Sequence, residues 1–179
     1  MRVFRFGLIA CVGTAALMFG SGLVAQQAAA PVAVAPVPPQ LLNAKKVFIS
    51  NAGADSGLFP HPFSGDPDRA YNEFYAGVVS WGRYQLVASP AEADLVFELQ
   101  LTAPNGPSNA DKEKGASDPL PMLRLVIYDR PTHYVLWALT ESILPAALQK
   151  THDHNFDEAV SDLVLDAGRL TKSLPNGMH

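Results

Sequence analysis

MLRLVIYDRPTHYVLWALTESIL, residues 122–144, contains two apolar segments joined by a short polar turn. The segments, residues 122–129 and 134–144, are rich in β-branched and aromatic residues, which favours β-strands. The turn at residues 130–133 is too short for a crossover connection, so the two strands must be antiparallel neighbours. The stretch therefore predicts a β-hairpin.

Further strands are predicted upstream of this hairpin. Apolar residues alternate with other residues over 94–102 (DLVFELQLT), the period of two that sets one strand face on the core and the other toward water. Residues 46–51 (KVFISN) are short, β-branched and apolar, which predicts a strand buried on both faces. Residues 84–88 predict one more short strand. Together these segments give a sheet of four to five strands.

A helix is predicted after the first strand. Asp66 is expected as its N-cap and Pro67 as its first helical residue, a favoured pairing at a helix start. Apolar residues from Ala70 to Trp81 recur at spacings of three and four, as on one stripe of a helix, and Gly82 ends the pattern.

A second helix is predicted over residues 156–174. Asn155 would be its N-cap, with Glu158 three residues later in a variant of the capping box. The element order β-α-β-β-β-β-α predicts an α+β fold, with both helices on one face of a mostly antiparallel sheet. The predicted domain spans residues 45–175, about the length of one typical domain.

Residues 1–25 have the features of a secretory signal peptide. Arg2 and Arg5 precede an apolar run over residues 7–19, and small residues follow, in the order that export requires. Cleavage is expected after Ala25, with residues 28–30 as second choices. The mature protein is therefore expected in the periplasm or secreted.

Two alternatives exist for this segment. An uncleaved membrane anchor needs about 20 apolar residues, and no charge occurs between Phe6 and Ala44, but Gly20-Ser21-Gly22 interrupts the apolar run. Lipidation would use Cys11, but Arg5 lies so close that almost no apolar segment would precede the cut. We therefore expect the membrane to be contacted only transiently, through the signal peptide.

Three other segments differ in composition from the predicted core. Residues 26–44 contain repeated prolines, which cannot continue a helix or donate to a sheet, so an Ala/Pro-rich tether is expected. Residues 103–121 are polar and rich in Pro, Gly and Ser, which predicts a mobile surface loop. Residues 176–179 are expected to form a disordered tail.

Charge and cysteine content exclude several classes of function. The chain has 13 Lys+Arg and 17 Asp+Glu; Arg2 and Arg5 leave with the signal peptide, so the mature chain has 11 basic and 17 acidic residues, a net charge of −6. Such a protein is a poor binder of nucleic acids and anionic membranes. Cys11 is the only cysteine, so the mature chain would have no disulfide, cysteine nucleophile or thiolate metal site.

Short motifs in the predicted strands carry a family resemblance. ADLV at residues 93–96, LVIYD at residues 125–129 and VLW at residues 135–137 resemble the small envelope domains of bacterial secreted proteins and lipoproteins. These include a domain family of unknown function, the N-terminal domain of the Tol-Pal translocation protein and the lipoprotein activators of penicillin-binding proteins. The resemblance covers the element order over residues 45–174. It implies a non-enzymatic module that docks other proteins, and it carries over no catalytic or cofactor-binding residue.

The segment richest in potential metal ligands is residues 152–157 (HDHNFD). In an extended segment, His152 and His154 could share a metal and Asp157 could add an oxygen ligand. This is the alternative function, a metal-dependent periplasmic enzyme. We favour a solvated loop before a helix cap, because no third histidine lies at a recognisable spacing. The sequence therefore predicts no catalytic residue, no metal and no cofactor.

The candidate binding feature is the loop over residues 52–65 (AGADSGLFPHPFSG). It carries Leu58, Phe59 and Phe63 among glycines and prolines, and apolar side chains on a loop can form a partner-docking patch. Alternatively, both phenylalanines fold back and cap the core. Because no other segment suggests chemistry, the sequence predicts an exported non-enzymatic protein-binding or accessory module of the bacterial cell envelope. Its expected partner is another envelope protein.

Overall fold

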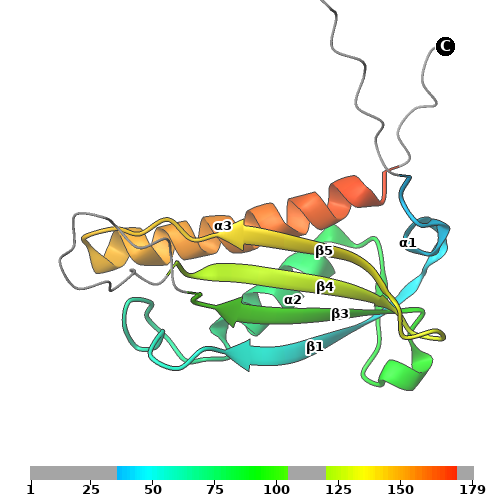
Figure 1. Cartoon of the computed structure of the whole chain (residues 1–179), viewed down its shortest axis with the longest axis horizontal. Helices are drawn as coiled ribbons and strands as arrows, with labels where there is room; N and C mark the ends of the chain where they lie inside the picture. Colours follow the sequence, from blue (N-terminus) through cyan, green and yellow to red (C-terminus); the bar gives the residue numbers. More distant parts are fainter. Residues whose placement is uncertain (1–35, 105–119, 173–179) are drawn as a thin grey trace, which may run out of the picture. The chain divides into compact units, whose positions relative to one another are not determined.

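The computed structural model describes residues 36–104 and 120–172, which are coloured in Figure 1. The predicted signal peptide, the predicted tail, linker residues 26–35 and most of the loop predicted at 103–121 lie outside the described residues. Within the described residues, no helix combines the length and the apolar character that crossing a membrane requires.

Five strands form one mixed sheet in the order β2-β1-β3-β4-β5 (Figure 1). Strand β1 (Lys46–Ala54) runs parallel to both β2 (Gln85–Leu86) and β3 (Leu95–Thr102). Strands β4 (Met122–Asp129) and β5 (Val135–Ser142) continue the sheet in antiparallel orientation. The predicted α+β class and the hairpin are confirmed. Parallel pairing requires a crossover connection, and the helix at residues 69–81 supplies it between β1 and β2.

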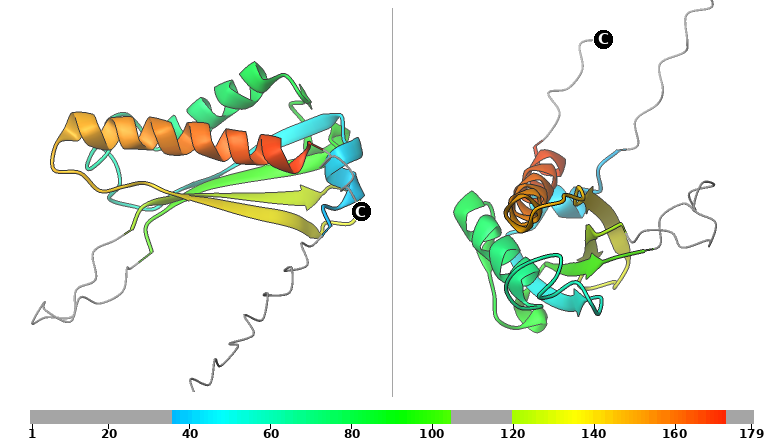
Figure 2. Two further views of the ribbon diagram at one scale, coloured as in Figure 1. Left: turned by 90° about the horizontal axis from the view of Figure 1, so that it is seen from above. Right: turned by 90° about the vertical axis from the view of Figure 1, so that its left-hand side faces the viewer.

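Both long helices, α2 (Arg69–Trp81) and α3 (Gln149–Leu170), lie on the same face of the sheet (Figure 2). A short helix α1 (Pro39–Asn43) and a 3-10 turn η1 (Pro90–Glu92) complete the described elements. The helices meet closely at Gly77, where a Cβ would lie 2.9 Å from a methyl group of Val164. No described helix covers the opposite face, which we call the open face.

The core lies between the sheet and the two long helices. In β3, every second side chain is buried against the helices, as the alternation predicted. The helices contribute buried residues at spacings of three and four. Among the fully buried side chains are Phe74, Phe97, Leu99, Leu125, Phe156 and Leu163.

The predicted start of α2 is wrong by two residues. The carboxylate of Asp66 accepts from the N–H of Asp68 at 2.9 Å, and its carbonyl accepts from the N–H of Arg69 at 3.1 Å. Asp66 thus forms a turn that precedes the helix. The N-cap residue is Asp68, whose side chain accepts no capping hydrogen bond. The predicted end is confirmed, because Gly82 adopts a left-handed conformation with φ of 67°.

The predicted start of α3 is also wrong, because the helix begins at Gln149 rather than Phe156. Asn155 lies inside the helix, and its side-chain N–H donates to the carbonyl of Leu144 at 2.8 Å. Two tertiary bonds hold the added turns: the Gln149 side chain donates to the Pro62 carbonyl at 2.5 Å, and Asp153 accepts from the Ser64 N–H at 2.8 Å. A local capping pattern contains no information about such distant partners.

Two expectations about the N-terminal side also need correction. The segment at residues 39–43, expected as part of the tether, is helix α1, and Leu41 is fully buried in the core. The Tyr84 hydroxyl donates to the Leu41 carbonyl at 3.2 Å, so packing extends to residues before Lys45. Strand β1 is not buried on both faces: Val47 is buried, whereas Phe48 is half-buried on the open face.

Candidate functional site

The predicted docking loop folds back onto the core. Phe63 is fully buried, with its ring centroid 5.1 Å from that of Phe156, and Leu58 is 4% exposed. Phe59 is half-buried and lies 6.0 Å from Phe63 between ring centroids. The structure thus assigns Leu58 and Phe63 to the core, in line with the core-capping alternative. A docking role for this loop stays a prediction, and Phe59 is its partly exposed apolar residue.

Arg69 fixes this loop to both helices. Its Nε donates to Glu73 at 2.6 Å, its Nη1 to Asp153 at 2.9 Å and its Nη2 to Asp157. The guanidinium also lies 4.5 Å from the ring centroid of Phe156. Burial alone would lower the pKa of Arg69, but the surrounding carboxylates outweigh that effect and raise it. The arrangement is a structural ion-pair network at the start of α2.

The same network occupies the segment that was considered for a metal. Residues 152–157 are helical rather than extended, so His152 and His154 point in different directions. His152 packs edge-on against Phe63 at 6.1 Å between ring centroids, while His154 lies 3.3 Å from Glu158. Asp157 is paired with Arg69. In residues 36–104 and 120–172, no group of three or more His, Cys, Asp or Glu is arranged to hold a metal.

The aspartates of two of the three motifs behind the family resemblance, Asp94 and Asp129, have structural roles. The Asp94 carboxylate accepts from the N–H groups of Lys45 and Lys46 at 2.8 and 2.9 Å. These backbone bonds lower the pKa of Asp94 and tie the start of β1 to β3. Asp129 accepts from the N–H of Thr132 at 3.2 Å and from its hydroxyl, which shapes the hairpin turn. Both aspartates therefore stabilise the fold through hydrogen bonds to neighbouring groups.

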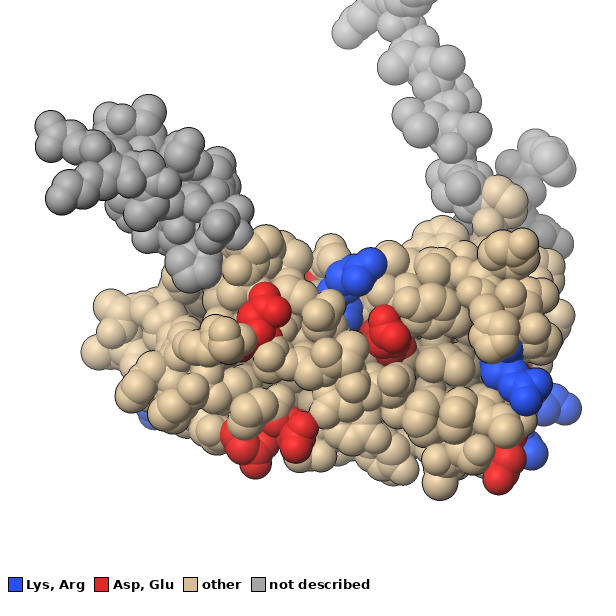
Figure 3. Space-filling view, turned by 60° about the horizontal axis from the view of Figure 1, so that its bottom comes forward, with Lys and Arg blue, Asp and Glu red and all other residues tan. Residues whose placement is uncertain are grey.

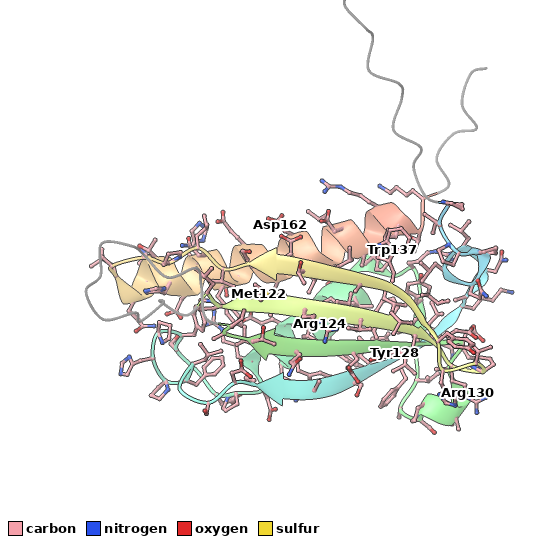
Figure 4. The ribbon with its side chains drawn as sticks, viewed as in Figure 1. Met122, Arg124, Tyr128, Arg130, Trp137 and Asp162 are labelled. Atoms are coloured by element: carbon pink, nitrogen blue, oxygen red, sulfur yellow. The ribbon has the colours of Figure 1, made fainter. Side chains whose placement is uncertain are left out.

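The open face is the candidate functional surface. The register sets its side chains in rows across the strands, including Glu98–Val126–Ala138 and Gln100–Arg124–Thr140. In Figure 4, the side chains of Met122, Arg124 and Tyr128 follow one another along β4. Most of this face is half-buried or exposed, although the other face of β3 and β4 is buried and that of β5 is half-buried.

A shallow cavity of about 590 Å³ lies at the end of the open face near the hairpin turn. Inside it, the Tyr128 hydroxyl donates to Glu98 at 3.2 Å, and burial together with this carboxylate raises the pKa of Tyr128. Isolated acidic and basic side chains interrupt a mostly uncharged surface on this side of the molecule (Figure 3). The cavity is lined by Pro90, Ala91, Val96, Glu98, Tyr128, Arg130 and His133.

The open face was not predicted as a binding surface from the sequence, although the alternation in one strand indicated a water-facing side. The alternation in residues 94–102 had already assigned Val96, Glu98 and Gln100 to the water-facing side of a strand. What the sequence could not show is that α2 and α3 both cover the opposite face, leaving this one open.

No protein-family model matches the chain, and no curated protein matches it either. Among solved structures, protein XCC0632 from Xanthomonas campestris is similar, with a TM-score of 0.42 and 15% identity over 77% of this chain and 93% of that one. The LpoB C-terminal domain from Salmonella enterica has a TM-score of 0.36 and 10% identity, over 56% of this chain and 83% of that one. TolB from Acinetobacter baumannii has a TM-score of 0.36 and 16% identity, over 69% of this chain and 28% of that one.

Bacterial lipoproteins are also among the similar solved structures. At such scores and identities, the similarity carries no argument about activity, ligands or partners.

Proposed function

We propose that this protein is an exported, non-enzymatic protein-binding module of the bacterial cell envelope, and that its partner, another envelope protein, contacts the open face. The observation that carries the proposal is the contrast within single strands. Residues such as Phe97 and Leu125 are buried under helices, whereas their neighbours Val96 and Arg124 face outward with no described element over them. Apolar side chains that stay partly exposed on a sheet face can contribute to a surface that another protein covers.

Export is part of the proposal and rests on the N-terminal sequence pattern. The predicted aromatic loop enters it only through Phe59, because Leu58 and Phe63 are buried. A docking partner fits the mildly acidic mature chain better than nucleic acid does.

The test changes the charge pattern of the open face without touching the core. We expect the full chain to capture a specific protein from envelope extracts by chemical crosslinking, and R124E with Q100K to lose that capture. The matched control, K150E with S80K, changes exposed positions on the helices and should capture the same protein as the parent. Equal capture by both double variants, with unchanged melting temperatures, would contradict the proposal.

A further inference from the structure

Strand β5 is an eight-residue edge strand, with β4 on one side and no described strand on the other. The Ile143 N–H donates to the Pro121 carbonyl at 2.9 Å, and the pairs Leu123↔Glu141 and Leu125↔Leu139 follow at two-residue steps. Because hydrogen-bonded pairs in an antiparallel ladder recur every second residue, the odd-numbered residues of β5 bond to β4.

The backbone groups of the even-numbered residues of β5 therefore point away from the sheet. Because the register shifts between Trp137 and Val135, this holds for Ala138, Thr140 and Ser142. Within residues 36–104 and 120–172, no backbone hydrogen bond to them from that side is present. Their N–H and carbonyl groups form a ready template for another strand.

Edge strands are commonly protected by lysine, proline or bulges. Strand β5 has neither lysine nor proline, and its irregularity lies near the hairpin turn, opposite Ile127 and Tyr128. Ala138, Thr140 and Ser142 are small and exposed, so they would not keep an approaching backbone away. The edge is physically open to pairing over most of its length.

Helix α3 runs alongside β5 (Figure 1), and acidic side chains of this helix lie near Glu141 of the strand. Glu141 on β5 shares this region with Asp162 and Asp166, and Arg169 is paired with Asp166. Figure 4 shows Asp162 on α3 beside β5. Burial, together with the neighbouring Asp166 and Asp162, raises the pKa of Glu141. Three carboxylates around one guanidinium leave a local surplus of negative charge.

Resting on the protein-docking function above, we propose that the outer edge of β5 pairs with an extended segment of a partner protein that carries lysine or arginine at every second position. In an added strand, alternate side chains would face α3 and meet the carboxylates of Glu141 and Asp162, while the others would extend the open face. A second copy of this chain fits poorly, because pairing about a two-fold axis would bring the two α3 acidic clusters toward each other.

The probe is a fluorescein-labelled peptide of alternating lysine and threonine, with a glutamate–threonine peptide and a peptide of clustered lysines as controls. Fluorescence anisotropy with the full chain should show that the alternating basic peptide binds about tenfold more tightly than either control, with affinity falling as salt rises. Equal binding of the three peptides, or no binding of the alternating basic peptide at millimolar protein, would overturn the inference.

Two variants locate the binding. T140P removes an N–H that points outward, so the β4–β5 hydrogen bonds remain while edge pairing is blocked. D162N removes one of the carboxylates expected to meet the basic side chains. We expect T140P to abolish binding and D162N to weaken it several-fold; full affinity in T140P with an unchanged melting temperature would contradict edge pairing.

Amide hydrogen exchange of the unaltered chain gives a readout that does not depend on T140P folding. Bound peptide should slow exchange at Ala138 and Thr140 by about tenfold and leave Leu139 and Glu141, already bonded to β4, nearly unchanged. Uniform slowing across β5 would count against edge pairing. If the peptide fails to bind while capture from extracts still depends on the open face, the edge inference fails and the proposed function stands. If the peptide binds but no envelope protein is captured through the open face, the edge inference stands and the proposed function fails.

Discussion

The helix-covered face and the open face of the sheet are built from alternating residues of the same strands, but they are used differently. Beneath α2 and α3, side chains such as Phe97 and Leu125 are buried and fix the fold. On the open face, Val96, Arg124 and Tyr128 keep part of their surface in water. The helix-covered face therefore contains residues that must be apolar for the domain to fold. The open face contains residues that binding to a partner, rather than folding, could constrain.

The largest expected effect is on the helix-covered face. Phe97 is 1% exposed and packs edge-on against Tyr84 at 5.6 Å between ring centroids. F97A should lower the free energy of unfolding by about 3–5 kcal/mol, whereas V96A, one residue away on the open face, should cost about 1 kcal/mol or less. Chemical denaturation of both variants measures the difference. Equal losses would show that the open face is also a packed surface in the folded chain.

A smaller but still large effect is expected at the ion-pair network. R69M leaves the carboxylates of Glu73, Asp153 and Asp157 without their shared partner, which should cost about 2–3 kcal/mol. R124M on the open face removes an exposed guanidinium and should change stability by about 0.5 kcal/mol or less. Thermal melting of the two variants compares them directly, and similar melting temperatures would rule out a structural role for the network.

The pH dependence of the folding stability should also arise on the helix-covered side, at Asp153 of α3. Backbone bonding to Ser64, with Arg69 adding to it, lowers the pKa of Asp153 from 3.8 to about 2. Because the folded pKa is below the unfolded one, this contribution is fully present above pH 3.8 and is lost as the pH falls toward 2. D153N should lower the melting temperature at pH 7 and flatten its decline between pH 4 and pH 2. An unchanged decline in D153N would contradict this account.

A small effect is expected for Y128F on the open face. It removes the hydrogen bond from the Tyr128 hydroxyl to Glu98, which is half-buried, so the cost should be about 0.5–1 kcal/mol. If the open face binds a partner, Y128F should reduce capture from envelope extracts while leaving the melting temperature nearly unchanged. A lowered melting temperature with full capture would show that Tyr128 serves folding instead.

The strands and the docking loop show where sequence reasoning succeeds and where it stops. Strand β4 was predicted to the residue, and β3 to within one residue, because alternation and short turns are local properties. The start of α3 was missed because Gln149 and Asp153 are held by bonds to the loop at residues 62–64, far away in the chain. The burial of Phe63 likewise depends on Phe156, which no pattern within the loop reveals.

The position of β1 in the sheet has a consequence for the order in which the chain can fold. Its two neighbours, β2 and β3, both follow it in the sequence, and the Lys45 amide bonds to Asp94, 49 residues later. As the chain emerges N-terminus first during synthesis, β1 can pair only with the two-residue strand β2 until β3 has also appeared. The β3–β4–β5 meander, in contrast, can assemble from consecutive segments. Until β3 appears, most of β1 remains an unpaired apolar strand that a holding chaperone could bind.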